Sequence, residues 1–375
     1  MIKLKEVILR NFSIIEDTRC QCDVEHKLVD VLILIMCATL CGIDEPDSIV
    51  EYGKNKLKFL TKHFGITKIP SASTLGRILS MVNGDTVGCC IVSIMKELLG
   101  TDGDIIAIDG KTICSTETMK SYKKSLHILT AYLTKNGVTL GQLAVGEKTN
   151  EIPMARELLE LIDVKNKIIT ADAMHCQKDT VEKIIKKGGD YVIGVKGNQK
   201  YFFDDIKLYF DDCISSKFRD DKQLYETAKT SEKSRDRYEI RTCYLIKDIN
   251  WLGVKDDWCG LKSIFAINRK TKKADVVSDE TNYYISSLEV PPERFLEIVR
   301  EHWKIESLHW QLDMTFSEDK CRVISPNGQK TLNVFRKLAL SLHKSYTANL
   351  KKKTSMRKNM FNCLLNDKLL IDLLL

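Results

Sequence analysis

The chain has 375 residues, 43% of them hydrophobic and 29% charged, which is enough for two or three globular domains with a sizeable core. The net charge is +7, and it is concentrated at one end. Residues 336–375 hold nine Lys or Arg and two acids, a net of +7, so the other 49 basic and 49 acidic residues cancel. This basic end predicts an acidic partner such as nucleic acid or, with equal support, a solvated tail.

The cysteines and the apolar segments exclude several classes of protein. The thirteen cysteines are scattered and form no C-x-x-C pair, so we expect reduced thiols in the cytoplasm and no zinc site. Val31–Ile43 is strongly apolar but only about 13 residues long, which is too short to span a bilayer. Charged residues from Lys3 to Arg10 interrupt any signal peptide. We therefore expect no contact with a membrane.

Residues 1–100 read as an all-helical N-terminal domain. We predict helices over 23–41, 48–64 and 85–99, and a further helix capped by Ser71 after Pro70. The segment Ser71–Arg77 resembles a helix-turn-helix recognition element, which makes this domain a candidate for binding DNA ends. A plain helical bundle is the favoured interpretation.

From residue 104 the pattern changes to strands and then to alternating helices and strands. We predict strands over 105–108, 125–134, 139–145, 167–171 and 191–195, with helices over 152–161 and 177–187. This order indicates an α/β protein with a mixed sheet covered by helices. Residues from 200 to about 282 contain charged runs and strand-like segments, which predict a β-rich insertion.

Arg300–Arg322 contains neither proline nor glycine and is predicted to form one helix. Its apolar residues at 305, 308 and 312 form one stripe. Glu306 lies on another side with His302, His309 and Asp313, and Trp303 and Trp310 flank that face. Such a group of polar side chains beside a core stripe indicates a functional site.

Two more acids follow predicted buried strands. Asp109 comes after residues 105–108, and Asp172 comes after residues 168–171. Open α/β sheets place their chemistry at the carboxyl ends of the strands, although a single aspartate there often only caps a loop. Together with Glu306, the two aspartates supply three hard oxygen ligands, a set that can hold two divalent ions for phosphodiester chemistry.

Four blocks of sequence carry a family resemblance. In order they are Ala107-Ile-Asp-Gly-Lys111, Ile169-Thr-Ala-Asp-Ala-Met174, Asp190-Tyr-Val-Ile-Gly-Val-Lys-Gly-Asn-Gln199 and His302-Trp-x-Ile-Glu306. They resemble the signature blocks of bacterial insertion-sequence transposases of the DDE class, and most closely the subgroup that includes the H-repeat-associated proteins. The resemblance covers the chain to about residue 345.

The resemblance implies a ribonuclease H-like catalytic domain over residues 101–345, with the β-rich insertion before the catalytic glutamate and a basic tail over 346–375. It places the catalytic and metal-binding triad on Asp109, Asp172 and Glu306, with two Mg²⁺ or Mn²⁺ ions. The implied activity is cutting of element ends in double-stranded DNA and joining of the 3′ hydroxyls to target DNA. We further expect a homodimer in the active complex and a cytoplasmic, nucleoid-associated location.

The chain departs from the wider family around the glutamate. Relatives often carry Tyr, Arg and Lys at fixed spacing there, whereas this chain has Val299, His302 and Asp313. The phosphate contacts of those cations must then come from other residues, and the role of Asp313 is open. His175 replaces a small residue, and a structural role is favoured over contact with metal or phosphate.

Several residues are candidate DNA contacts. A lysine and two amides follow a strand end, three cations are candidate phosphate ligands, and an aromatic side chain is placed to stack on a frayed base. These candidates are Lys196, Asn198, Gln199, Arg235, Arg237, Arg300, His302 and Trp303. Trp310, by contrast, is expected in the core.

Two other interpretations use the same residues. The first is a catalytically inactive or domesticated DNA-binding relic on the transposase scaffold, although all three acids are present. Alternatively, His302, Glu306 and His309 lie on one helix face and suit a transition metal. That hypothesis leaves both aspartates without a role.

Overall fold

The computed structural model describes residues 2–374 except 21, 23, 115–124, 146–149, 216–224, 235–236, 274–275, 349 and 351–353. The chain forms two compact units. Unit 1 contains residues 1–102, 110–150 and 307–375, and unit 2 contains residues 103–109 and 151–306. Strand β1 (Ile105–Thr112) and helix α10 (Pro292–Phe316) therefore each contribute residues to both units.

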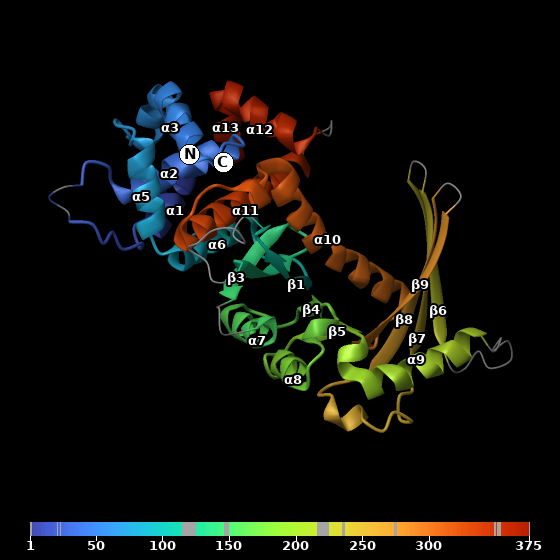
Figure 1. Cartoon of the computed structure of the whole chain (residues 1–375). Helices are drawn as coiled ribbons and strands as arrows, with labels where there is room; N and C mark the ends of the chain where they lie inside the picture. The colour runs from blue at the N-terminus through green and yellow to red at the C-terminus, as the bar shows by residue number, and fades with distance from the viewer. Residues whose placement is uncertain are drawn as a thin grey trace. The chain divides into compact units, whose positions relative to one another are not determined.

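The N-terminal part of unit 1 is helical, as predicted, and Figure 1 draws it in blue. Its helices are α1 (Ile2–Phe12), α2 (Leu28–Leu40), α3 (Pro46–Asn55), α4 (Leu57–Phe64), α5 (Ala72–Met81) and α6 (Gly84–Leu99). The predicted helix over 48–64 is wrong, because the chain breaks at Lys56 into α3 and α4. The predicted start at residue 23 is also wrong, since α2 begins at Leu28. Ser71 caps α5 by accepting a hydrogen bond from the backbone N–H of Thr74 at 3.2 Å.

The C-terminal part of unit 1 is helical too, which the charge count did not predict. The helices are α11 (Pro326–Ala348), α12 (Met356–Leu365) and α13 (Asp367–Leu374). Both short helices pack on α11, and Lys56 forms an ion pair of 2.7 Å with Asp367 at the start of α13. The segment expected to be a solvated tail therefore buries side chains such as Met360 and Leu370.

The strands of the α/β region have the order of a ribonuclease H-like core. In unit 1, β2 (His127–Leu133) pairs antiparallel with β3 (Val138–Val145). In unit 2, the first residues of β1 pair in parallel with β4 (Ile168–Ala171), and β4 pairs in parallel with β5 (Asp190–Val195). The neighbours run β3-β2-β1-β4-β5, so the predicted fold class is confirmed. Helix α7 (Glu151–Leu161) leads into β4 and packs on α8 (Lys178–Lys186), which connects β4 to β5 and packs on β5.

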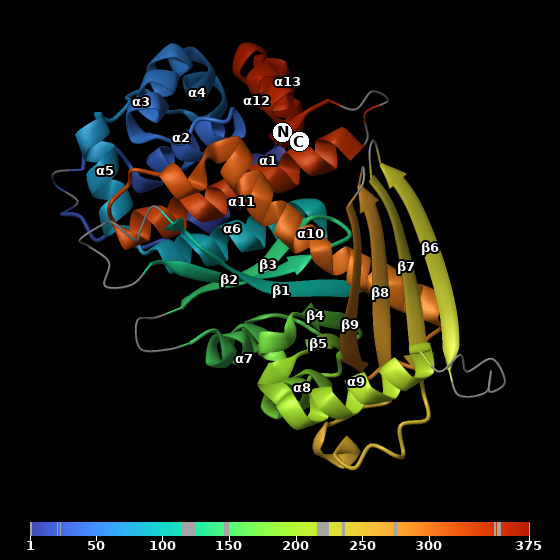
Figure 2. The same ribbon diagram turned by 45° about the vertical axis from the view of Figure 1, so that its right-hand side comes forward.

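The predicted β-rich insertion begins with a helix. Helix α9 (Lys200–Ser215) precedes four antiparallel strands, β6 (Glu226–Ser234), β7 (Arg237–Ile246), β8 (Ser263–Lys273) and β9 (Val276–Ser286). They continue the sheet of unit 2 in the order β5-β9-β8-β7-β6, and Figure 2 shows α9 near one end of these long strands. Successive residues on β9 face opposite sides, so Tyr283 meets Phe210 of α9 whereas Tyr284 stacks on Phe265, which in turn stacks on Phe295 of α10.

Helix α10 differs from its predicted bounds at both ends. It begins at Pro292, a residue well suited to the first helical turn, and ends at Phe316 rather than Arg322. The helix stops because Ser317 adopts left-handed backbone angles with φ of 52°. The apolar stripe is confirmed, since Ile305, Leu308 and Leu312 are all buried.

No single helix in the described part of the chain is long and apolar enough to cross a membrane. The helices α5 and α6 meet the same criterion only as a pair, with a bend of 90° between them.

Candidate active site

The register of the sheet places Asp109 and Asp172 at the same level. Ile108 of β1 pairs with Ala171 of β4, and the two aspartates are the next residues of their strands. Alternation along a strand directs each aspartate to the face used by the residue two positions earlier. Asp109 still belongs to β1, which continues to Thr112, so the prediction that it follows the end of the strand is wrong. The parallel pairing with β4 ends at Ile108, one residue before Asp109, and this agrees with the strand predicted over 105–108.

Asp172 stands at the start of a short 3-10 helix, η3 (Ala173–His175). Its carboxylate accepts a hydrogen bond from the backbone N–H of Met174 at 3.2 Å, and the side chain is exposed. Two amide side chains hold the loop that follows. Asn198 donates to the carbonyl of Ala173 at 2.7 Å, and Gln199 donates to the carbonyl of Cys176 at 2.9 Å.

His302 of α10 lies against β4. Its Nδ1 is 3.0 Å from the hydroxyl of Thr170, a hydrogen bond that fastens the helix to the strand two residues before Asp172. Burial lowers the pKa of His302, while the nearby charges of Asp109 and Asp172 act in the opposite direction. The ring is therefore neutral at physiological pH and sits close to both aspartates.

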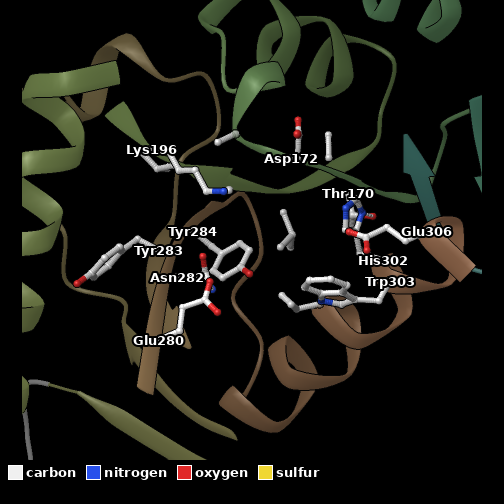
Figure 3. Close-up of a pocket in the computed structure, with 16 residues that line it drawn as sticks. Thr170, Asp172, Lys196, Glu280, Asn282, Tyr283, Tyr284, His302, Trp303 and Glu306 are labelled. Atoms are coloured by element: carbon white, nitrogen blue, oxygen red, sulfur yellow. Dashed lines mark hydrogen bonds between the residues drawn. The ribbon is translucent and has the colours of Figure 1, made fainter. Parts of the chain in front are cut away.

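A cavity of about 220 Å³ opens between β4, β5, β9 and α10 in unit 2. Asp172, His302 and Glu306 all line it. Glu306 is one helical turn beyond His302, and in Figure 3 it lies beside His302 and Thr170. The cavity thus brings the second aspartate and the glutamate of the expected triad to one site.

The three carboxylates suit a divalent cation in their chemistry, since hard oxygen ligands are those that Mg²⁺ and Mn²⁺ prefer. Asp172 and Glu306 are exposed, so an ion has a route to them. As the side chains stand, no three His, Cys, Asp or Glu residues in the described ranges form a group that can hold a metal ion. Binding would therefore require side-chain rotation. The same observation gives no support to a transition-metal site on His302, Glu306 and His309.

The residues of β9 that line the cavity, such as Glu280 and Asn282, were not predicted from the sequence. Arg269 of β8 lies 5.8 Å from the centre of the Trp303 ring and forms an ion pair of 2.6 Å with Glu280. Hydrogen bonds from Asn282 and Arg269, and the charge of Lys196, lower the pKa of Glu280. The residues of β5, β8 and α10 are far apart in the sequence, and only the register of the sheet brings them together. Their proximity therefore has no local sequence signal.

The candidate DNA contacts fall into different surroundings. Lys196 and Trp303 line the cavity and are exposed. Arg300 forms an ion pair with Glu232, and Arg237 forms one with Glu239. Arg235 lies outside the described residues.

Three open questions about single residues have structural answers. His175 is buried with its Nε2 3.0 Å from a carboxylate oxygen of Glu151, in agreement with the structural role that was favoured. Asp313 accepts a hydrogen bond from Lys111 at 2.9 Å. The prediction that Trp310 lies in the core is wrong, because 62% of its surface is exposed. The apolar stripe of α10 occupies the buried side and leaves Trp310 outside it.

Comparison with protein families gives a clear result. A model described as the transposase DDE domain matches residues 100–342, and a second model, described as associated with that domain, matches residues 9–95. The chain belongs to the DDE transposases. This makes it a DNA-cleaving or DNA-transferring enzyme by class, and the sequence resemblance to that family is confirmed.

Curated relatives agree with this assignment. The protein named "H repeat-associated putative transposase YhhI" of Escherichia coli is 34% identical over 368 residues, which cover 94% of each chain. "Putative transposase YncI", also of Escherichia coli, is 36% identical over 343 residues, 89% of this chain and 86% of that protein. A shorter match, 32% over 74 residues and 20% of this chain, is to "Inactive transposase YbfQ".

A structure of the piggyBac transposase synaptic complex with hairpin DNA covers 99% of this chain and 78% of that chain at 10% identity. Its TM-score of 0.39 is too low to define the fold.

Proposed function

We propose that this protein cuts the ends of an insertion element and joins the 3′ hydroxyls to target DNA, with Asp109, Asp172 and Glu306 as its catalytic residues. The observation that carries the proposal is the register of β1 and β4, which sets the two aspartates side by side next to the cavity lined by Glu306. Three carboxylates can hold divalent cations, and such cations neutralise the negative charge on the transferring phosphoryl group.

The proposal includes two Mg²⁺ or Mn²⁺ ions held by the three carboxylates. When bound, such ions activate the attacking oxygen and stabilise the leaving oxygen of the phosphodiester. The chain's own residues then orient the site. Thr170 and His302 fix α10 to β4 through their hydrogen bond of 3.0 Å, and Asn198 holds the loop after Asp172.

DNA reaches the site, in this proposal, through the exposed rim of the cavity. Lys196 supplies a positive charge for a phosphate, and Trp303 supplies an aromatic face for a base, with Arg269 near its ring. Arg237 and Arg300 would exchange their glutamate partners for phosphates. Asn198 and Gln199 use their amide N–H groups on loop carbonyls, so a direct contact with DNA would be made through their remaining donors and acceptors. Cutting two ends requires two active sites, which a homodimer would provide.

The test is a cleavage assay with the purified full chain and DNA that carries the terminal inverted repeats flanking its gene. Wild type should nick this DNA in Mg²⁺, and Asp109→Asn should not. Asp104→Asn is a matched control, because Asp104 is an exposed aspartate five residues earlier that pairs with Arg294. Equal cutting by wild type and Asp109→Asn would overturn the triad assignment.

The second candidate function is a DNA-binding relic without catalysis. It draws some support from the side chains of the triad, which do not form an ion-holding group in the described ranges. Specific binding to the inverted repeats with no cleavage in either Mg²⁺ or Mn²⁺ would favour this alternative over the enzyme.

A further inference from the structure

We propose that Lys111 is a positioning residue, which ties together the two chain segments that follow Asp109 and Glu306. The inference rests on the proposed function, because it concerns how two of the three proposed metal ligands are held. Both segments pass into unit 1 directly after the ligand, β1 after Asp109 and α10 after Glu306. Lys111 and the acids it contacts all belong to unit 1.

The ammonium group of Lys111 meets three carboxylates from the end of α10 and the turn beyond it. Its Nζ lies 2.9 Å from Asp313, 3.1 Å from Asp319 and 3.4 Å from Glu318. Only 12% of the Lys111 side chain is exposed. One lysine two residues after Asp109 thus contacts acids that follow Glu306 by seven to thirteen positions.

The backbone after α10 is shaped to bring these acids back to β1. Ser317 is one of two non-glycine residues with positive φ in the described part of the chain, at 52°. Such a conformation is unfavourable for a residue with a side chain, so the surroundings must stabilise it. The turn leads into the 3-10 helix η6 (Glu318–Lys320), where the Asp319 carboxylate also accepts the backbone N–H of Cys114 at 3.1 Å. Asp319 therefore contacts both Lys111 of β1 and the backbone of Cys114 just after this strand.

Glu318 anchors the cluster in the core of unit 1. Its side chain is fully buried, and one carboxylate oxygen accepts hydrogen bonds from Asn333 at 2.9 Å and Arg336 at 3.1 Å. Arg336, itself buried, also forms a hydrogen bond of 2.7 Å with Asp44. The other oxygen of Glu318 faces Lys111. A buried charge network of this kind contributes little net stability when complete, but it favours one geometry because each broken contact leaves a buried charge.

The charges of the cluster support each other. Burial raises the pKa of Asp313, and the nearby charges of Asp319 and Glu318 act in the same direction, whereas Lys111 lowers it. Burial would raise the pKa of Glu318, but Arg336 and Lys111 lower it. Lys111 contacts three carboxylates within 3.4 Å, which makes it unsuitable as a phosphate contact.

The distances along the chain are short enough for this to matter at the site. Two residues of strand separate Lys111 from Asp109, about 7 Å, and seven residues of helix separate Asp313 from Glu306, about 10 Å. Strand and helix are both stiff over such lengths. Outer residues that orient metal ligands typically change metal affinity by about 10- to 100-fold when they are removed.

The experiment compares Lys111→Met with Lys330→Met in the full chain. Lys330 is a matched control, because its pair with Asp85 is 2.7 Å long, its side chain is 18% exposed, and it lies in the same unit away from β1. Hydrogen exchange of the metal-free protein should quicken in peptides over 105–113 and 307–320 for Lys111→Met only. Binding of Mn²⁺, followed by electron paramagnetic resonance, should weaken about 10-fold or more for Lys111→Met and stay unchanged for the control.

Each outcome has a distinct meaning. Unchanged exchange in Lys111→Met would overturn the tie itself, whatever the metal does. Faster exchange with wild-type Mn²⁺ affinity would overturn the positioning role. If wild type does not bind Mn²⁺, or if Asp109→Asn binds it as wild type does, the result counts against the proposed function. The exchange result then still tests whether Lys111 holds the two segments together. If Lys111→Met does not fold, Asp313→Asn removes one contact of Lys111 and keeps Glu318 paired, and it should show the same pattern at smaller size.

Discussion

The protein contains two sets of three acids that are built in opposite ways. Asp109, Asp172 and Glu306 belong to unit 2, where Asp172 and Glu306 are exposed on a cavity. The second set lies in unit 1 around Lys111, and its central member, Glu318, is fully buried between Lys111 and Arg336. Its other members are Asp313 and Asp319.

The difference separates a site for an external ligand from a structural element. In the second set the cations are part of the chain and lie at contact distance, so each acid has a positively charged partner inside the fold. In the first set Asp172 and Glu306 line an accessible cavity, which we propose as the place where an external cation and a phosphate enter. In this proposal the same residue types serve binding in one region and positioning in the other, and the burial and partners of each set decide which.

The largest expected effect comes from the first set. Glu306→Gln should reduce cleavage by about a thousandfold or more, because it removes one of the three carboxylates proposed to hold the metal ions. Glu301→Gln is the matched control, since Glu301 lies on the same helix and forms an ion pair with Lys304. Initial rates of nicking in Mg²⁺ provide the measurement. Similar losses in both variants would mean that the helix, not the carboxylate, was damaged.

The second effect tests the buried set. Lys111→Met should lower the free energy of unfolding by about 3–5 kcal/mol, because it leaves a buried carboxylate of Glu318 without one of its two cations. Lys330→Met should change it by less than about 1 kcal/mol, since Asp85 is mostly exposed. Urea denaturation of both variants measures the difference. Equal small effects would show that the cluster around Glu318 is not a buried network.

A smaller effect is expected at the rim of the cavity. Trp303→Ala should weaken binding of DNA with a frayed end by about 1–3 kcal/mol, the usual contribution of one stacked base. Trp310→Ala is the control, because it is a tryptophan of the same helix that is 62% exposed and does not line the cavity. Fluorescence anisotropy with labelled DNA gives the two affinities. Equal weakening would point to general surface contacts, and no weakening in either would remove stacking from the account.

The smallest effect concerns a third buried cation of unit 1. Burial lowers the pKa of Lys337 to about 7, while its Nζ donates to Thr130 and Gln142 at 2.8 Å. The unfolded pKa is near 10.5, so the folded state loses its proton first. Below pH 7 Lys337 is charged in both the folded and the unfolded state, and burying its charge destabilises the folded state in full. This destabilisation decreases as pH rises from 7 and is absent above 10.5.

Wild type should therefore gain stability relative to Lys337→Met as pH rises from 7, by about 1 kcal/mol per pH unit at most. Urea denaturation of both proteins at pH 6.5, 8 and 9.5 measures this gain. Parallel stabilities across that window would show that the lysine keeps its ordinary pKa.

Much of the fold was predictable because its signals are local. Apolar runs gave β1 and β4, and with them the positions of Asp109 and Asp172 in the sheet. Ser71 capped a helix as its sequence indicates. The bounds of α10 were missed because its end depends on a serine in a conformation that usually takes glycine.

The rest depends on contacts between residues far apart in the chain. Lys111 and Asp313 are 202 positions apart, and Thr170 and His302 are 132 apart. Neither pair has a sequence signal, although a lone threonine in the apolar strand of residues 168–171 was a hint. In residues 336–375 the excess of charge concealed the spacing of apolar residues that buries α12 and α13.

The most direct test of the central claim is anomalous diffraction from crystals of the full chain grown with Mn²⁺ and element-end DNA. The account predicts Mn²⁺ peaks with carboxylate oxygens of Asp109, Asp172 and Glu306 at about 2.1 Å. It predicts no peak beside Asp313, Glu318 and Asp319, because the ammonium group of Lys111 already contacts all three carboxylates. Mn²⁺ bound elsewhere, with these three carboxylates still apart in the presence of DNA, would contradict it.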